Sequence, residues 1–319
     1  MPSLNWVGKE AVINHDKEVP FKLLKKVKSV SVGENSQNLI IHGDNLEALK
    51  ALMPYYGGKI KCIYIDPPYN TGNEKWIYND KVNSPKIKKW LGKVVGPQSE
   101  DLCRHDKWLC MMYPRLKLLR DLLSDEGSIF ISIDDNEHCN LKQALDEIFG
   151  EENFVSNIIW QKKYTQSNDA KYFSATHDFI VCYAKSIKNP DFKINLLART
   201  EEQDARYKNP DNDPRGPWMT QPLHAKSGTD TKYEFTFTNG VKWRPPAGTF
   251  PRYSMGTLKE ADKNKTIWFG KNGNAVPRLK KYLNEMKQGV IPKTIWLYDE
   301  VGSNEIGRAS CRERVCLYV

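Results

Sequence analysis

The sequence predicts an α/β protein in which a parallel, doubly wound sheet is followed by a second, largely irregular α+β domain. Short apolar runs alternate with segments of helical period up to residue 161, which is typical of strand–helix–strand units. After Gln161 the chain becomes rich in Pro, Gly, Asn and aromatic residues and loses its helical period, which predicts the change of domain.

The first elements are predicted by caps and apolar spacing. Residues 1–35 are polar and lysine-rich, and we expect a surface arm. Residues 39–41 (LII) predict a short buried strand, and Asp44 or Asn45 can cap the helix that follows. Gly57 and Gly58 would end that helix, and residues 59–65 (KIKCIYI) predict a second strand.

The rest of the first domain continues the alternation. Residues 71–100 form a long polar connection, a feature that is usually functional or disordered. Residues 108–127 predict a helix that Pro114 kinks or restarts and Gly127 ends. A strand at 128–133, a helix at 137–150 and a strand at 154–161 follow.

Three local signals stand out in residues 162–298. An Asn-Gly pair at 239–240 lies between alternating residues in KYEFTFTNGVKW, which predicts a β-hairpin. Residues 276–286 (VPRLKKYLNEM) predict a short helix. The stretch WFGKNGN at 268–274 predicts a tight turn.

Composition narrows the class of protein. The chain has 319 residues and a formal net charge of +9, which favours acidic partners such as nucleic acid. No stretch approaches the roughly 18 apolar residues that a membrane span needs, and the N-terminus has no apolar signal segment. The seven cysteines contain no CxxC pair, so we expect reduced thiols in a cytoplasmic protein.

The stretch DPPYN, residues 66–70, follows the apolar strand IKCIYI and carries the clearest chemistry. In open α/β sheets, ligands bind at the carboxyl ends of the strands. The prolines restrict the backbone, so the carboxylate of Asp66 and the carbonyl of Pro67 become two neighbouring acceptors. Tyr69 adds a flat ring. This arrangement suits a planar base with an exocyclic amino group, such as an adenine turned out of a duplex.

DPPYN in this context resembles the catalytic motif of DNA amino-methyltransferases. The ordered set LIIHGDNLEALKAL, IKCIYIDPPYNTGN, HDKWLCMMYPRLKLLRDLLSDEGSIFISIDDNE and LDEIFGEENFVSNIIW is similar to the modification subunits of type III restriction systems. The similarity runs from about residue 39 to residue 302. It implies a Rossmann-like, class I S-adenosylmethionine-dependent methyltransferase fold with circularly permuted order and a target-recognition domain.

The resemblance implies a role for each residue of the motif. Asp66 and the Pro67 carbonyl would accept hydrogen bonds from adenine N6 and stabilise the positive charge that develops on it. Tyr69 would stack on the flipped base, and Pro68 would shape the loop. S-adenosylmethionine would be the cofactor, double-stranded DNA the substrate, and Asp44 a candidate contact to the adenosine of the cofactor.

Simpler structural roles compete with several of these assignments. DPPY can be only a rigid turn with a packing tyrosine, and Asp44 can be only a helix cap. Helix starts and caps explain two further pairs, His105 with Asp106 and Asp134 with Asp135, so we assign them no chemistry. We expect no metal site.

The resemblance also predicts how the chain is divided. Residues 36–161 are the catalytic part, 162–298 the target-recognition domain, and 299–304 the start of a cofactor-binding part whose glycine-rich turn is absent. Residues 305–319 begin EIGRASCRERV, which matches the translation of a common sequencing adapter. We therefore expect a truncated chain with an incomplete sheet, a tail that is an artefact, and no activity by itself.

Other functions remain open at this point. Methylation of cytosine N4 is the nearest alternative, although serine more often replaces the aspartate in those enzymes. Relatives that act on RNA or on protein glutamine often begin the motif with Asn and lack the middle domain. A non-catalytic DNA-recognition subunit is the alternative from another class. The expected partners are a restriction subunit and a second copy of the chain, in a prokaryote or a phage.

Overall fold

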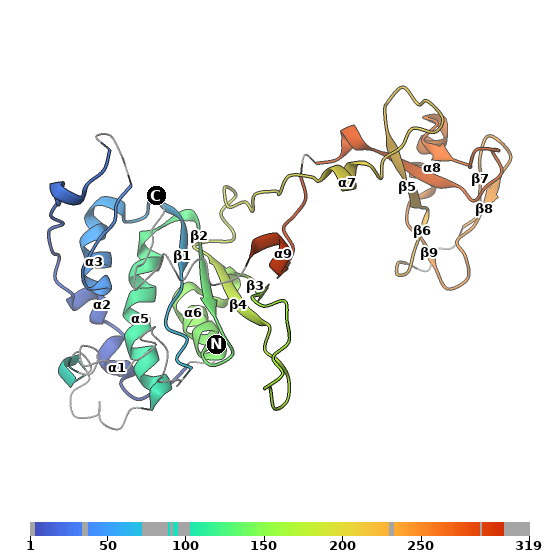
Figure 1. Ribbon diagram of the computed structural model, residues 1–319. Helices are drawn as coiled ribbons and strands as arrows, with labels where there is room; N and C mark the ends of the chain where they lie inside the picture. Colours follow the sequence, from blue (N-terminus) through green and yellow to red (C-terminus); the bar gives the residue numbers. More distant parts are fainter. Residues whose placement is uncertain are drawn as a thin grey trace. The chain divides into compact units, whose positions relative to one another are not determined.

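The computed structural model describes residues 4–33, 38–71, 89, 92–94, 103–229, 233–287 and 289–302. They form two compact units (Figure 1). Unit 1 comprises the residues up to 194 and those from 293 onward, and unit 2 comprises residues 195–292. Each unit has a hydrophobic core of its own. Unit 2 is therefore an insertion between two segments of unit 1.

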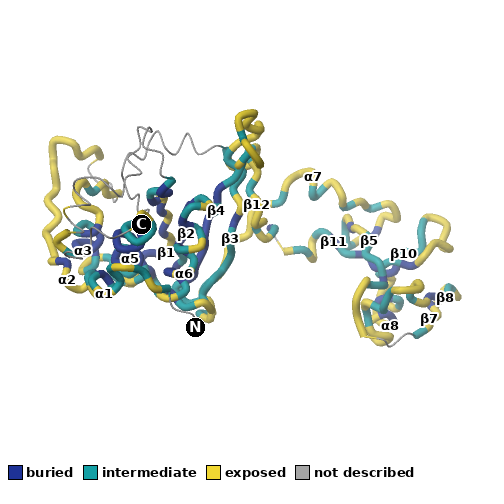
Figure 2. The backbone as a smooth tube through the Cα atoms, turned by 90° about the horizontal axis from the view of Figure 1, so that it is seen from below, coloured by how far each residue is buried: buried dark blue, intermediate teal, exposed yellow. Residues whose placement is uncertain are grey.

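Unit 1 is built on one five-stranded sheet in the order β1-β2-β4-β3-β12. Its strands are β1 (Ile60–Ile65), β2 (Leu123–Ile133), β3 (Phe154–Gln161), β4 (His177–Ala184) and β12 (Ile295–Trp296). Its helical segments are α1 (Lys9–Val12), α2 (His15–Glu18), η1 (Lys28–Val30), α3 (Asn45–Tyr56), α5 (Arg104–Leu122), α6 (His138–Phe149), η3 (Glu151–Asn153) and α9 (Tyr298–Val301). Helices α3, α5 and α6 lie on the same side of the sheet (Figures 1 and 2).

The α/β class is confirmed, and the predicted strands β1, β2 and β3 run in the same direction, but β4, from the stretch assigned to the second domain, joins their sheet in the opposite direction. The pairs β1–β2 and β3–β12 are parallel, whereas β4 runs antiparallel to both β2 and β3. β3 and β4 follow each other without a crossover helix, and such a direct connection returns the chain in the opposite direction.

Caps explain where the helices begin. The Asp44 carboxylate accepts hydrogen bonds from the backbone N–H groups of Leu46 and Glu47, at 2.9 and 3.3 Å, and starts α3. Cys103 and Asp106 form a capping box at the start of α5. This helix continues through Pro114 to Leu122, so the predicted restart at the proline does not occur.

Gly127 lies inside β2 rather than at a helix end. A Cβ atom there would lie 2.7 Å from the carbonyl oxygen of Ile60, on the neighbouring strand. The glycine therefore allows β1 and β2 to approach, and α5 ends five residues earlier, at Leu122.

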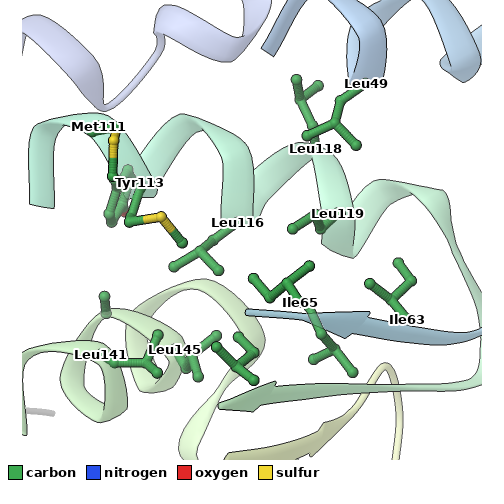
Figure 3. Close-up of a cluster of buried hydrophobic side chains, with 14 of the residues drawn as sticks. Leu49, Ile63, Ile65, Met111, Tyr113, Leu116, Leu118, Leu119, Leu141 and Leu145 are labelled. Carbon is green, nitrogen blue, oxygen red and sulfur yellow. The ribbon is translucent and has the colours of Figure 1, made fainter. Parts of the chain in front are cut away.

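The core of unit 1 lies between the sheet and its helices. Figure 3 shows side chains of α5, α6 and β1 directed toward one another. Leu116, Leu145 and Ile63 are fully buried there. Burial of each such side chain contributes about 1.5–3 kcal/mol relative to exposure. The apolar spacing that predicts α5, α6 and β1 is thus the spacing that fills this core.

Two predicted elements differ from the structure. Residues 39–41 form no strand, and Leu39 and Ile40 are exposed, because within the described residues no neighbour pairs with this segment. Residues 276–286 are not a helix: Arg278–Tyr282 form strand β11, followed by the short turn η4 (Leu283–Glu285). Pairing of β11 with strands on both sides overrides its local helical pattern.

Unit 2 consists of short elements. They are α7 (Glu201–Asp204), β5 (Trp218–Pro222), β6 (His224–Ala225), β7 (Phe235–Thr236), β8 (Lys242–Trp243), β9 (Phe250–Pro251), α8 (Met255–Lys263), β10 (Ile267–Trp268), β11 and η4. The predicted hairpin is confirmed as β7 and β8, with Gly240 at a φ of 84° in the turn. Gly270 and Gly273 also have positive φ, as the predicted turn requires.

The boundaries of the compact units differ from the predicted domain boundaries. The predicted boundary after residue 161 falls between β3 and β4 of one sheet, and residue 298 is the first residue of α9. The N-terminal segment also belongs to unit 1, because Val12 is fully buried and Lys117 of α5 pairs with Asp16 at 2.8 Å. Residues 305–319 and nearly all of the 71–100 connection lie outside the described residues.

The described residues contain no helix long and apolar enough to cross a membrane. Their five cysteines are all free thiols.

Candidate functional site

The stretch Asp66–Asn70 leaves the carboxyl end of β1, beside the end of β2. Ile65 pairs with Ile131, which places Ser132 next to Asp66. The Ser132 hydroxyl donates to Asp66 Oδ1 at 2.7 Å and accepts from the Tyr64 hydroxyl at 3.1 Å. These bonds orient one oxygen of the carboxylate.

Two hydrogen-bond acceptors of the motif remain open. Asp66 is exposed, and within the described residues its Oδ2 accepts no hydrogen bond. The Pro67 carbonyl likewise accepts none from the described part of the chain, whereas the Pro68 carbonyl accepts from the Trp108 indole at 2.6 Å. The exposed carboxylate of Asp66 thus has one oxygen available for a donor such as an amino group, and the adjacent Pro67, which is buried, has a carbonyl that no described residue uses.

The backbone of the motif is held in a conformation that non-glycine residues rarely adopt. Asn70 has a φ of 57°, in the left-handed region. Its side-chain amide donates to the Arg104 carbonyl at 3.2 Å and to Glu137, while Arg104 donates to the Asn70 carbonyl at 3.1 Å. The start of α5 therefore fixes the end of the motif.

Glu137, just before α6, contacts the residues that hold the end of the motif in place. Its side chain is fully buried and contacts His105 Nδ1 at 2.7 Å through Oε1 and Asn140 at 2.7 Å through Oε2. Asn70 donates to the same carboxylate. The sequence interpretation missed Glu137 and assigned no chemistry to His105. The acidic run after the predicted strand at 128–133 was the available signal.

Asp106 has the structural role expected of it, whereas Asp134 stabilises a turn ahead of α6 instead of capping that helix. Asp106 caps α5 through the backbone N–H of Cys103, at 3.0 Å, and Trp108 is fully buried. Asp134 accepts from the backbone N–H of Asn136 at 2.9 Å.

Tyr69 does not present the open flat face that its role as a stacking platform requires. Its ring belongs to the core of unit 1 and is only 6% exposed. Burial raises the pKa of its hydroxyl well above the usual range, and the charges of Asp66 and Asp178 raise it further. The hydroxyl therefore stays protonated, and stacking on a base would require the ring to be uncovered.

Asp178 joins the site from β4. Its side chain is fully buried and pairs with Lys162 at 2.6 Å. The sequence interpretation placed both residues in the second domain, because the strand His177–Ala184 follows a polar stretch. Pairing of β4 with β2 brings them to the edge of the sheet that holds Asp66.

The described residues include few groups that could bind the cofactor. Asp44 uses Oδ1 to cap α3, and it lies near Arg115, whose pKa burial lowers to about 10 while Asp44 opposes that shift. A glycine-rich turn binds a cofactor where the glycines let other groups come close to the backbone. Gly43, beside Asp44, shows no such close approach among the described residues, because an added Cβ atom would have no neighbour within 4 Å. The described part of the chain also holds no cluster of three or more potential metal ligands.

Unit 2 has a basic, aromatic cavity on its three-stranded sheet β10-β11-β5. The residues lining it include Arg206, Lys208, Trp218, Trp268 and Lys271. Cations beside aromatic rings suit phosphates and bases.

A charged cluster anchors the loop before β5 to the same sheet. Lys280 of β11 is buried and pairs with Asp211 and, at 2.8 Å, with Asp213. Arg215 and Tyr282 also hydrogen-bond Asp213, each at 2.8 Å. This cluster is structural, because its charges are matched internally.

Comparison with known proteins gives a consistent set of similarities. A family model described as DNA methylase matches residues 60–308. The Mod subunit of the type III restriction-modification enzyme StyLTI from Salmonella typhimurium is 35% identical over 297 residues, covering 88% of this chain and 43% of its own length. The EcoP15I Mod subunit from Escherichia coli is 31% identical, covering 95% and 54%.

Two further similarities are shorter or more distant. The EcoPI Mod subunit of Escherichia phage P1 is 40% identical over 196 residues, which are 58% of this chain and 30% of that protein. The solved M1.HpyAVI–SAM complex aligns over 51% of this chain and 59% of its own, at 17% identity and a TM-score of 0.28. The chain spans about half the length of the curated relatives that it matches over most of its own length.

Proposed function

Because this chain belongs to the DNA methylase family, we propose that the protein methylates N6 of adenine in double-stranded DNA, with S-adenosylmethionine as the methyl donor. The family membership itself confirms the resemblance drawn from DPPYN and its flanking elements. The observation that best supports the proposed reaction is the exposed Asp66 carboxylate at the end of β1, whose Oδ2, like the adjacent Pro67 carbonyl, accepts no hydrogen bond from the described residues.

The cofactor would supply a methyl group activated by its sulfonium. Asp66 and Pro67 would each accept a hydrogen bond from the adenine amino group and so orient its nitrogen lone pair. As the nitrogen becomes positively charged in the transition state, the two acceptors stabilise that charge. Ser132 keeps the carboxylate of Asp66 in place, so little reorganisation is needed at that moment. Asp44 is the one described candidate for a cofactor contact, through its remaining oxygen.

Unit 2 would recognise the DNA. The cavity offers Arg206, Lys208 and Lys271 as cations for phosphates and the half-buried Trp268 as a ring for a base, whereas Trp218 is only 4% exposed. We therefore assign target recognition to residues 195–292, the range of the compact unit, rather than to 162–298.

The relatives indicate the biological setting. Several are Mod subunits of type III restriction-modification enzymes, from bacteria or a phage. A restriction subunit and a second copy of the chain are the proposed partners, and the prokaryotic cytoplasm is the proposed location.

The test is methylation by the complete product of the gene that encodes this chain. We would express it in a host that lacks adenine and cytosine-N4 methylation and analyse the nucleosides of its DNA by mass spectrometry. N6-methyladenine is the expected product. Asp66→Ala should lower its yield at least about 100-fold, the effect typical of removing one preorganised group at a developing charge.

Asp125→Asn is the matched control, because this exposed carboxylate lies near the other end of β2. It should leave the yield unchanged. N4-methylcytosine instead of N6-methyladenine would correct the target base, and methylation that survives Asp66→Ala would remove Asp66 from the reaction.

A further inference from the structure

The loop between β3 and β4, residues 162–176, exposes large aromatic side chains to solvent. Tyr164, Tyr172 and Phe173 are 72%, 81% and 97% exposed, and Phe173 is the most exposed large hydrophobic residue of those described. Figure 1 shows the loop as a yellow-green hairpin beyond the ends of β3 and β4, and most of it is exposed in Figure 2. A neighbouring pair of exposed rings indicates a contact surface.

Hydrogen bonds give the loop a defined shape. At its base, the backbone N–H groups of Lys162 and Lys163 donate to the Thr176 carbonyl, at 2.9 and 3.2 Å. Farther out, the backbone N–H of Ser167 donates to the Ser174 hydroxyl at 2.7 Å. The two rings therefore project from a closed turn, which lowers the entropy lost when they bind.

The register of the sheet places this loop at the edge that carries Asp66. Ile133, at the end of β2, pairs with Phe179 of β4, and Gln161 pairs with His177. β4 therefore starts, and β3 ends, where β1 and β2 end. Adjacent strands are about 4.8 Å apart, so the base of the loop lies roughly two strand spacings from β1.

Electrostatics links the loop to the same site. Lys162, the first loop residue, pairs with Asp178 at 2.6 Å, and the charge of Asp178 acts on Tyr69 beside Asp66. The loop itself carries three lysines and one aspartate, a net charge of +2 (3 − 1). Lys171 lies 5.3 Å from the centre of the Tyr172 ring. A basic surface with exposed rings complements a polyanion with flat bases.

We propose that the 162–176 loop binds DNA beside the target base, an inference that rests on the proposed function. Tyr172 and Phe173 insert next to the nucleotide that leaves the stack and replace the stacking it loses. Lys163 and Lys171 contact the flanking phosphates. A base inside the duplex stack cannot reach Asp66 at the end of β1. The loop would therefore favour the opened duplex, in which the target base can reach that residue.

The experiment compares binding of this 319-residue chain to two labelled duplexes by fluorescence anisotropy. One duplex is intact, and the other carries an abasic site with 2-aminopurine beside it. The unaltered chain should prefer the abasic duplex, since its gap is already open, and should quench the 2-aminopurine by stacking.

The double variant Tyr172→Ala with Phe173→Ala should bind the abasic duplex about tenfold more weakly and lose the quenching, as expected for loss of ring–base stacking. Phe173→Trp should keep both, because it retains a ring at this position. Tyr55→Ala is the matched control, since Tyr55 is a 59% exposed aromatic residue of the same unit, on α3. It should change neither reading.

Each other outcome is decisive. If the unaltered chain binds DNA and the double variant binds and quenches equally well, the loop proposal is wrong and the proposed function stands. If the unaltered chain binds neither duplex, the loop proposal fails, whereas the proposed function is decided by the methylation test on the complete gene product. If Phe173→Trp behaves like the alanine variant, stacking is not the basis of the contact.

Discussion

The fully buried carboxylate of Glu137 holds together residues that are far apart in the sequence. Asn70 follows the acceptor pair, His105 starts α5, and Asn140 lies in α6, and all three contact Glu137. A carboxylate serves here because it only accepts, while Asn70 and Asn140 each offer an amide donor. Glu137 therefore positions the motif without touching the base that Asp66 would hold.

We expect Glu137→Gln to destabilise unit 1 and to loosen the motif. The new amide puts a donor beside the donor of either Asn70 or Asn140, and a buried donor without a partner costs about 1–3 kcal/mol. Urea unfolding followed by circular dichroism should show a loss of about 2 kcal/mol in the free energy of unfolding.

Glu126→Gln is the control for Glu137→Gln, because Glu126 forms only a surface pair with Lys61 and should lose less than about 1 kcal/mol. Equal losses in the two variants would show that Glu137 is not a special support. Among single residues, the sequence singled out Asp66 and Pro67 as candidate site residues because they are neighbours in the chain. It missed Glu137 because only the fold brings residues 70, 105 and 137 together.

At the scale of elements, Gly127 permits the pairing of β1 and β2 because it has no Cβ atom. A Cβ atom at this position would lie 2.7 Å from the Ile60 carbonyl oxygen and 3.0 Å from the Ser124 carbonyl oxygen. Neither backbone can move away without disturbing the parallel pairing of β1 and β2. That pairing sets the position of Ser132 relative to Asp66.

Gly127→Ala should therefore lower the free energy of unfolding of unit 1 by about 1–3 kcal/mol, the usual cost of overpacking. Gly43→Ala is the matched control, because an added Cβ there meets nothing within 4 Å. Thermal unfolding of both variants tests the prediction. A melting temperature that falls no further in Gly127→Ala than in Gly43→Ala would contradict the close approach of the two strands.

At the scale of the whole molecule, unit 2 leaves and re-enters unit 1 between β4 and β12. Where unit 2 begins and ends, Leu197 and Val290 exchange both backbone hydrogen bonds, each at 2.9 Å. β12 then pairs with β3 and so returns the chain to the sheet of unit 1. Because each unit has its own core, their stabilities can respond differently to solution conditions.

We expect unit 2 to lose stability in acid through Asp213. Hydrogen bonds from Arg215, and then from Lys280 and Tyr282, hold the pKa of Asp213 well below its usual range against the opposing effect of burial. Above the unfolded-state pKa of about 3.9 the stabilisation is complete. As pH falls below that value the unfolded chain binds the proton first, so stability declines toward the depressed folded-state pKa.

Urea titrations from pH 6 to pH 3, followed by the fluorescence of Trp218 and Trp268, would measure this decline. Asp213→Asn should destabilise unit 2 by about 3 kcal/mol at pH 6, since Lys280 loses one of two buried partners, and should flatten the decline. Glu234→Gln, which alters an exposed carboxylate, should change neither. An unaltered pH profile in Asp213→Asn would exclude this residue as the cause.

The sequence by itself determined the α/β class, the family, the position of Asp66 and Pro67 directly after a strand, and the hairpin around Gly240. Each depends on residues close together in the chain, where caps, apolar spacing and turn chemistry act. The sequence did not determine the direction of β4, the strand at 278–282, the burial of Tyr69 or the joining of Glu137 and Asp178 to the site. Those features depend on which segments pair and pack across the sheet, and only the tertiary structure decides that.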